Sequence, residues 1–133
     1  MKMIRILLVD DHSVVRSGLG QMLGLEEDLK VVGEASNSEE ALKMVDIISP
    51  DIILMDIKMP GMDGVRLTKE IKERLPSCNI IMFTLHGDYL KQAIEAGATG
   101  YLLKDIKRQN LIQAIRRVHN GQVVISENIQ SEI

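Results

Sequence analysis

The sequence predicts an α/β fold in which a parallel sheet is covered by helices on both faces. Short runs of consecutive apolar residues alternate with longer segments whose apolar residues recur at helical spacing. Runs such as residues 6–9 and 80–83 have no polar face, which is typical of strands buried on both sides. The 133 residues contain no internal repeat or low-complexity linker, so we expect one compact domain.

Five strands are expected at the apolar runs, and most of them end at a polar or charged residue. They cover residues 2–9, 30–35, 52–55, 79–84 and 99–103. The second run is centred on Val31 and Val32 and is followed by Gly33, so we expect this strand at or near an edge of the sheet.

Five helices are expected between and after these strands. They cover residues 13–24, 38–48, 64–75, 88–97 and 111–118. The pair His12-Ser13, Ser38 and Asp88 stand where side chains can cap the first, second and fourth helices. Residues that commonly end a helix follow four of them: Pro50, Pro76, Gly97 and Gly121.

Strands and helices that alternate through short loops predict a doubly wound sheet, because right-handed crossovers leave few other arrangements. For five strands the flavodoxin-like order 2-1-3-4-5 is common, and its crevice lies between the first and third strands. The carboxyl ends of these two strands would bring Asp10, Asp11 and Asp56 together. Thr84 and Lys104 follow the fourth and fifth strands and are expected to close the same rim.

Three carboxylates in one pocket repel one another, so a hard divalent cation is expected with them. Magnesium takes oxygen ligands, typically one or two carboxylates with water and phosphate oxygens. We expect Asp11 and Asp56 as direct ligands, Asp10 through water, and a backbone carbonyl from the loop after Asp56. Lys104 and Thr84 would neutralise an incoming phosphoryl group while Asp56 attacks as a nucleophile.

Composition excludes several classes of function. A net charge of −3 argues against nucleic-acid binding by this domain alone, because such binding depends on phosphate neutralisation. No apolar segment approaches the ~18 residues of a membrane span, and the first residues do not resemble a signal peptide, so we expect a cytoplasmic location. The single Cys78 cannot form an internal disulfide and is expected to be structural.

Over nearly its whole length the sequence resembles a response-regulator receiver domain of two-component signalling. Four pieces carry the resemblance: residues 8–12 (Leu-Val-Asp-Asp-His), residues 54–64, Thr84 and residues 96–104. An acidic pair, a phosphoacceptor, a hydroxyl and a lysine at four strand ends form a highly specific combination. Asp-His at residues 11–12, Gly-Glu-Ala-Ser-Asn at 33–37 and Gly-Tyr-Leu-Leu-Lys-Asp at 100–105 further resemble the NarL/FixJ type, which carries a C-terminal helix-turn-helix.

The resemblance implies that Asp56 accepts a phosphoryl group from a phosphohistidine of a sensor histidine kinase. It implies that Asp10 and Asp11 hold Mg²⁺ together with Asp56 and the backbone carbonyl of Lys58. Such a domain is a phosphoacceptor switch rather than an enzyme, since it only phosphorylates itself and slowly loses the phosphate.

The resemblance also implies that Thr84 and Lys104 sense the phosphoryl oxygens and that Tyr101 moves inward as Thr84 shifts. The side chains of Lys58 and His86 are possible modulators of dephosphorylation. Phosphorylation would change the surface around the fourth and fifth helices, which a partner would then recognise. The first and fifth helices are candidate surfaces for a homodimer.

The receiver is expected over residues 1–121, with 122–133 as a C-terminal segment or the start of a linker. We favour a truncated protein over a stand-alone receiver, so DNA would be reached only through an output domain absent from this chain. Two departures from the family pattern stand out. The segment 84–96 is about two residues short, and Asp105 follows Lys104 where many receivers have proline, so a cis bond is not expected there.

Three alternatives remain. An aspartyl phosphatase of the haloacid-dehalogenase type would need an Asp-x-Asp spacing, whereas the acids here are adjacent. A flavin-binding module is disfavoured by one Phe, two Tyr and no Trp, which leave little to stack on the ring. A degenerate receiver used only for dimerisation is disfavoured because every key residue type is present.

Overall fold

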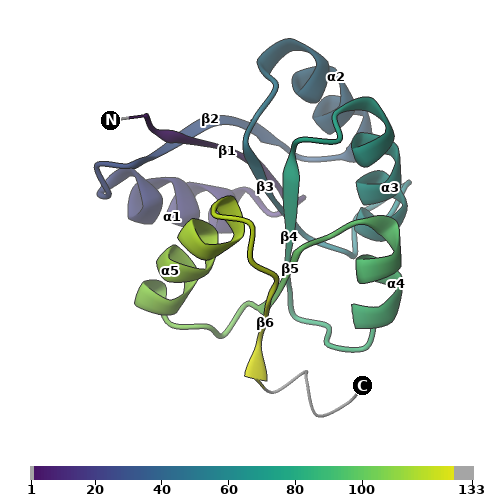
Figure 1. Cartoon of the computed structure of the whole chain (residues 1–133). Helices are drawn as coiled ribbons and strands as arrows, with labels where there is room; N and C mark the ends of the chain where they lie inside the picture. The colour runs from purple at the N-terminus through teal and green to yellow at the C-terminus, as the bar shows by residue number, and fades with distance from the viewer. Residues whose placement is uncertain (1, 128–133) are drawn as a thin grey trace.

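The computed structural model describes residues 2–127 and contains one parallel sheet in the order β2-β1-β3-β4-β5-β6 (Figure 1). The strands are β1 (Ile4–Val9), β2 (Leu29–Ala35), β3 (Ile52–Met55), β4 (Asn79–Thr84), β5 (Gly100–Leu103) and β6 (Val124–Ile125). The helices are α1 (Ser13–Gly24), α2 (Ser38–Ile48), α3 (Gly64–Arg74), α4 (Leu90–Ala96) and α5 (Arg108–His119). The doubly wound α/β class is confirmed, and β2 lies at an edge as expected.

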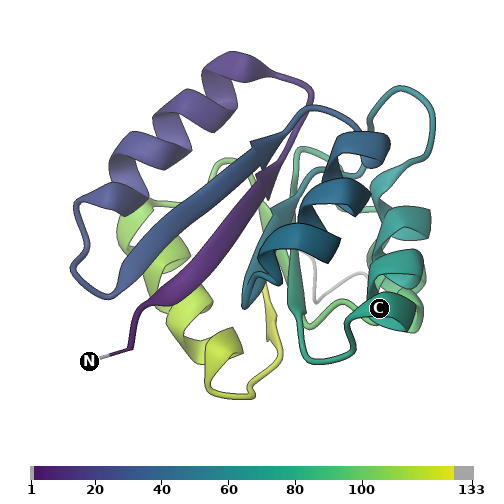
Figure 2. The same ribbon diagram turned by 90° about the horizontal axis from the view of Figure 1, so that it is seen from above.

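The sheet separates two hydrophobic cores. Helices α1 and α5 cover one face, and α2, α3 and α4 cover the other, as Figure 2 shows. In β3, Ile53 and Met55 face the three-helix side, whereas Ile52 and Leu54 face α1 and α5. This alternation explains why the central strands are apolar at every position, because both of their faces are buried.

The expected number of five strands is wrong, because Val124–Ile125 forms a sixth strand beside β5. The backbone N–H of Val124 donates to the Thr99 carbonyl at 3.0 Å, and that of Ser126 donates to the Tyr101 carbonyl at 2.9 Å. The edge of β5 offers these unpaired backbone groups, which a two-residue strand can satisfy although its sequence signal is weak. Residues 128–133 of the expected C-terminal segment lie outside the described residues.

Two of the expected helix caps are wrong and one is shifted. Asp88 does not cap the fourth helix, which begins at Leu90 and has no side-chain cap. His12 precedes α1 but makes no capping hydrogen bond, because its ring contacts the acidic pair instead. Asn37 rather than Ser38 caps α2, with its side-chain oxygen 2.9 Å from the Glu40 amide nitrogen. Polar residues near a helix start therefore located these helices but did not identify the residues that cap them.

The predicted end of the fourth helix at Gly97 is confirmed. Gly97 ends α4 with a φ of 113°, a left-handed conformation that favours glycine.

The described residues contain no cis peptide bond, and so the bond between Lys104 and Asp105 is trans. Among the helices of residues 2–127, none is long and apolar enough to cross a membrane.

Candidate functional site

Asp56 stands directly after β3, at the carboxyl edge of the sheet between β1 and β4. Its backbone N–H donates to the Val9 carbonyl at 2.9 Å, which holds the residue against the end of β1. Its Oδ1 accepts a hydrogen bond of 2.8 Å from the amide of Ile57, and the residue is only 5% exposed. The backbone therefore fixes both the position and the direction of this carboxylate.

Gly64 makes the tight loop around Asp56 possible. Its amide donates to the Ile57 carbonyl at 2.8 Å. A Cβ at this position would lie 2.2 Å from the Asp56 carbonyl oxygen and 2.9 Å from the Ile57 Cα. Only glycine permits this close approach of backbone to backbone.

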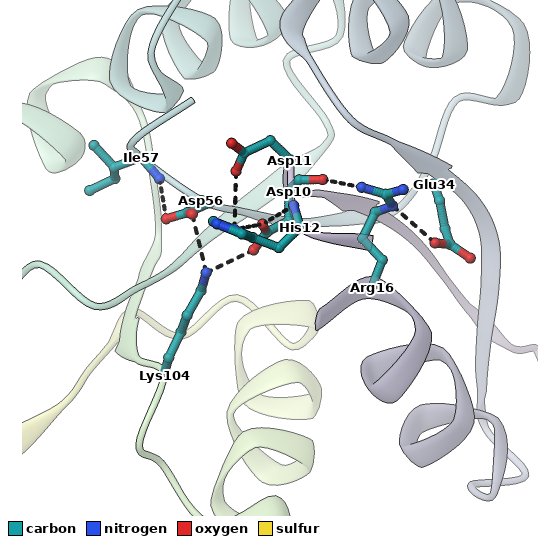
Figure 3. Close-up of polar contacts among 8 residues, drawn as sticks. All are labelled: Asp10, Asp11, His12, Arg16, Glu34, Asp56, Ile57 and Lys104. Carbon is teal, nitrogen blue, oxygen red and sulfur yellow. Dashed lines mark hydrogen bonds and ion pairs between the residues drawn. The ribbon is translucent and has the colours of Figure 1, made fainter. Parts of the chain in front are cut away.

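Lys104 joins two nearly buried carboxylates (Figure 3). Its Nζ lies 2.8 Å from Asp10 Oδ2 and 3.1 Å from Asp56 Oδ2. Burial favours the neutral form of Asp10, but hydrogen bonds from Lys104 and His12 outweigh it and lower the pKa of Asp10. Burial likewise opposes the charge of Lys104, but the hydrogen bonds to both carboxylates raise its pKa. This network therefore favours the ionised forms of Asp10 and Lys104.

Asp11 brings a further carboxylate to the same rim. Its Oδ1 is buried and accepts no hydrogen bond from the described residues, although Nδ1 of His12 lies 3.1 Å away. One ligand atom from each of Asp10, Asp11, His12 and Asp56 lies within 4.8 Å of the others. A buried oxygen without a donor inside a cluster of acids fits a cation ligand, so this acidic pocket could bind a divalent metal.

Two residues at the rim, His12 and Arg16, were not predicted as site residues. His12 was predicted as a helix cap and as part of the family pattern, without a role in the site, yet its Nδ1 lies 2.9 Å from Asp10 Oδ1. The guanidinium of Arg16 donates to the Asp10 carbonyl and lies 3.1 Å from Glu34 Oε1, which ties α1 and β2 to the loop after β1 (Figure 3). The position of His12 beside an acidic pair was an available signal, whereas nothing in the sequence pointed to Arg16.

Thr84 and Tyr101 belong to a second set of contacts beside the carboxylates. The Lys104 amide donates to the Thr84 carbonyl at 2.8 Å, which places the two residues next to each other. Oγ1 of the buried Thr84 accepts a hydrogen bond of 3.2 Å from the His86 amide. The hydroxyl of the buried Tyr101 donates to the His86 carbonyl. The backbone of His86 therefore links both side chains.

The side chains of Lys58 and His86 are exposed and both contact Tyr89. The Lys58 Nζ lies 4.8 Å from the centre of the Tyr89 ring, and a hydrogen bond with Tyr89 raises the pKa of Lys58. The His86 ring meets the same Tyr89 ring edge to face, with centroids 6.3 Å apart. Both candidate modulators thus contact the residue that precedes α4.

Comparison with known proteins identifies the family. The response regulator receiver domain matches residues 6–116 of the chain. The chain belongs to this family. As a receiver of the NarL/LuxR type, it is a signalling domain rather than a typical enzyme.

Curated relatives of this receiver are longer than the chain. The chain is 40% identical over 133 residues to the transcriptional regulatory protein LnrK of Bacillus subtilis (strain 168), and the match covers 98% of the chain and 60% of LnrK. It is 39% identical over 124 residues to the nitrate/nitrite response regulator protein NarL of Escherichia coli (strain K12), covering 92% of the chain and 57% of NarL. The chain thus spans less than two thirds of these relatives.

Solved structures share the fold closely. A LuxR-family response regulator from Aurantimonas sp. SI85-9A1 has a TM-score of 0.94 at 35% identity, covering 99% of this chain and 96% of that one. The isolated REC domain of RcsB from Salmonella enterica serovar Typhimurium, in the presence of phosphomimetic BeF₃⁻, has a TM-score of 0.88 at 26% identity, with 98% of each chain covered.

Proposed function

We propose that this receiver accepts a phosphoryl group on Asp56 from a phosphohistidine of a sensor histidine kinase, in a reaction that depends on Mg²⁺. The observation that supports this proposal most is the position of the Lys104 ammonium. It bridges Asp10 and Asp56 beside Asp11, whose Oδ1 accepts no hydrogen bond from the described residues. The proposed nucleophile, the candidate cation site and a fixed positive charge thus share one rim.

Several residues of the chain have distinct roles in the proposed phosphoryl transfer. A carboxylate oxygen of Asp56 attacks phosphorus, the bond from phosphorus to the donor nitrogen breaks, and the donor imidazole leaves with that electron pair. The amide of Ile57 orients the attacking carboxylate. Asp10, Asp11, Asp56 and the backbone carbonyl of Lys58 would hold Mg²⁺, which when bound neutralises charge on the phosphoryl oxygens.

The phosphorylated state would be read through Lys104 and Thr84. Phosphorylation adds charge of about −1.5 to −2 and three acceptor oxygens at Asp56. Lys104 would pair with one of these oxygens, and the Thr84 hydroxyl would donate to another. Moving Thr84 disturbs the His86 amide that it accepts from, and with it the Tyr101 hydroxyl bond. The side chains of Lys58 and His86 are proposed to modulate hydrolysis.

The output of this switch is proposed to be transcription. LnrK is a transcriptional regulatory protein, and RcsB dimers have been solved bound to DNA. We propose that residues 1–121 act as the receiver and that 122–133 begin a linker to a DNA-binding domain outside this chain. We further propose that the protein forms a homodimer through α1 and α5 and that phosphorylation changes the surface around α4 and α5. We also propose a cytoplasmic location.

Intact mass after incubation with acetyl phosphate tests the proposed chemistry. We expect a Mg²⁺-dependent gain of one phosphoryl group in the wild type and none in Asp56→Asn. Absence of any gain, with acetyl phosphate or with a phosphorylated kinase, would favour a degenerate receiver. Steady turnover of small phosphate esters would instead favour the phosphatase alternative, and a yellow purified protein the flavin module.

A further inference from the structure

The Nδ1 atom of His12 lies between two carboxylates of the candidate metal site. It is 2.9 Å from Asp10 Oδ1 and 3.1 Å from Asp11 Oδ1. The backbone N–H of His12 also donates to Asp10 Oδ1 at 2.9 Å, so the residue is held against the acid from two sides. The proposed phosphoryl transfer assigns no role to this ring.

These separations match those of ligand atoms around one ion. In an octahedral site with bonds of about 2.1 Å, neighbouring ligand atoms lie about 3.0 Å apart. The ligand atoms of Asp10, Asp11, His12 and Asp56 all lie within 4.8 Å of one another. When the ring proton is on Nε2, the lone pair of Nδ1 is free to bind a metal. The His12 side chain is 62% exposed, so the ring can adjust without disturbing the core.

Charge and donor chemistry indicate which ion such a set would favour. Three ionised carboxylates and one ammonium from Lys104 leave two negative charges, which a divalent ion neutralises. An uncharged imidazole adds a donor without changing that balance. Magnesium prefers oxygen ligands, whereas imidazole nitrogen suits divalent first-row transition metals.

We propose that His12 is a metal ligand of this receiver and that its nitrogen makes the site favour a divalent transition-metal ion, tested first as Mn²⁺, over Mg²⁺. The inference rests on the proposed cation site at Asp56 and extends it by naming an additional ligand and the class of ion. Mn²⁺ is tested first because it accepts the carboxylate and water ligands of such a site and is paramagnetic, so that a coordinated nitrogen can be detected.

Pulsed electron paramagnetic resonance of Mn²⁺ bound to the untagged protein detects a coordinated nitrogen directly. We expect ¹⁴N modulation from an imidazole in the wild type and its loss in His12→Ala. Titration of free Mn²⁺ should show affinity weakened by about tenfold in His12→Ala, while Mg²⁺ affinity, measured by competition, stays the same. His119→Ala serves as the control, because it removes an exposed histidine in the last turn of α5.

The other outcomes separate this inference from the proposed function. Nitrogen modulation that persists in His12→Ala, or unchanged Mn²⁺ affinity, overturns the assignment. Tighter binding of both ions in His12→Ala would mean that the ring competes with the metal, which also overturns it. Binding of both ions without ¹⁴N modulation removes only the role of His12, whereas binding of neither ion removes the proposed cation site as well. Asp56→Asn should weaken both ions if they share this site.

Discussion

The ammonium nitrogen of Lys104 lies 3.1 Å from Oδ2 of Asp56, a contact that joins the end of β5 to the end of β3 across β4. The same nitrogen lies 2.8 Å from Asp10 Oδ2, so one cation balances two almost completely buried carboxylates. In the proposed switch this lysine stabilises the resting rim and later pairs with the phosphoryl group. Removing its charge should therefore affect stability before any phosphate is present.

Lys104→Met keeps the apolar stem but leaves Asp10 and Asp56 buried without their cation. We expect a loss of about 1–3 kcal/mol in the free energy of unfolding, measured by urea denaturation in EDTA. Added Mg²⁺ should stabilise the variant more than the wild type, because the ion no longer competes with the ammonium. Exposed Lys91→Met should change stability by less than about 0.5 kcal/mol. A Lys104→Met protein as stable as the wild type in EDTA would contradict this role.

The shifted pKa values of Asp10 and Lys104 predict how stability depends on pH in the absence of metal. Hydrogen bonds lower the Asp10 pKa below its usual 3.8 despite burial, so its contribution is present above that value and is lost as pH falls through the lower folded pKa. The Lys104 pKa is raised above 10.5 despite burial, so its contribution is present below that value and is lost as pH rises through the folded pKa.

Urea unfolding of wild type and Asp10→Asn over a pH series tests the predicted loss of the Asp10 contribution at low pH. The stability of the wild type relative to the variant should be constant near neutral pH. It should decrease on acidification through the folded pKa of Asp10, because a protonated carboxyl resembles an amide. A difference that grows on acidification would reverse the assigned direction of the shift.

Gly64→Ala tests the loop that positions Asp56. The added methyl would lie 2.2 Å from the Asp56 carbonyl oxygen, so the loop must move. We expect a loss of about 2 kcal/mol or more in stability and a lower extent of phosphorylation by acetyl phosphate. Gly18→Ala is the matched control, because its Cβ has no atom within 4 Å. This change within α1 should stabilise the protein by about 0.5–1 kcal/mol.

Much of the fold could be predicted because its strands are buried on both faces. The continuous apolar runs at residues 6–9 and 52–55 mark central strands, and the strand ends place polar residues at one rim. The strand at Val124–Ile125 could not be predicted in this way. It forms because β5 offers an unpaired edge, which is a tertiary condition rather than a local pattern.

In the candidate site, too, some contacts follow from the strand order and others do not. Topology alone brings Asp10, Asp56 and Lys104 together, because parallel strands end at the same edge. The contacts of His12 depend on a side-chain rotamer, and those of Tyr101 run through a backbone carbonyl in a loop. Neither contact follows from strand order, so neither was predicted.

The rate at which a thiol reagent modifies Cys78 measures how readily the core around it opens. It is fully buried, and burial raises its pKa to about 12. We expect a thiol reagent to modify the folded protein at least ~10³-fold more slowly than the urea-unfolded chain, because reaction requires opening. The chain has one cysteine, so modification needs no assignment. Fast labelling under native conditions would show that this part of the three-helix side opens readily.

Tyr101→Phe tests the link between the Tyr101 hydroxyl and the loop after β4. The variant keeps the buried ring but removes the donor to the His86 carbonyl. We expect a loss of about 1–2 kcal/mol in stability and faster hydrogen exchange at the His86 amide, which donates to Thr84 Oγ1. Ser126→Ala is the control, because it removes a different hydrogen bond, from the Leu103 amide at 3.2 Å. That control should leave exchange at His86 unchanged, whereas equal effects of both variants would show general loosening of this edge instead of a specific link.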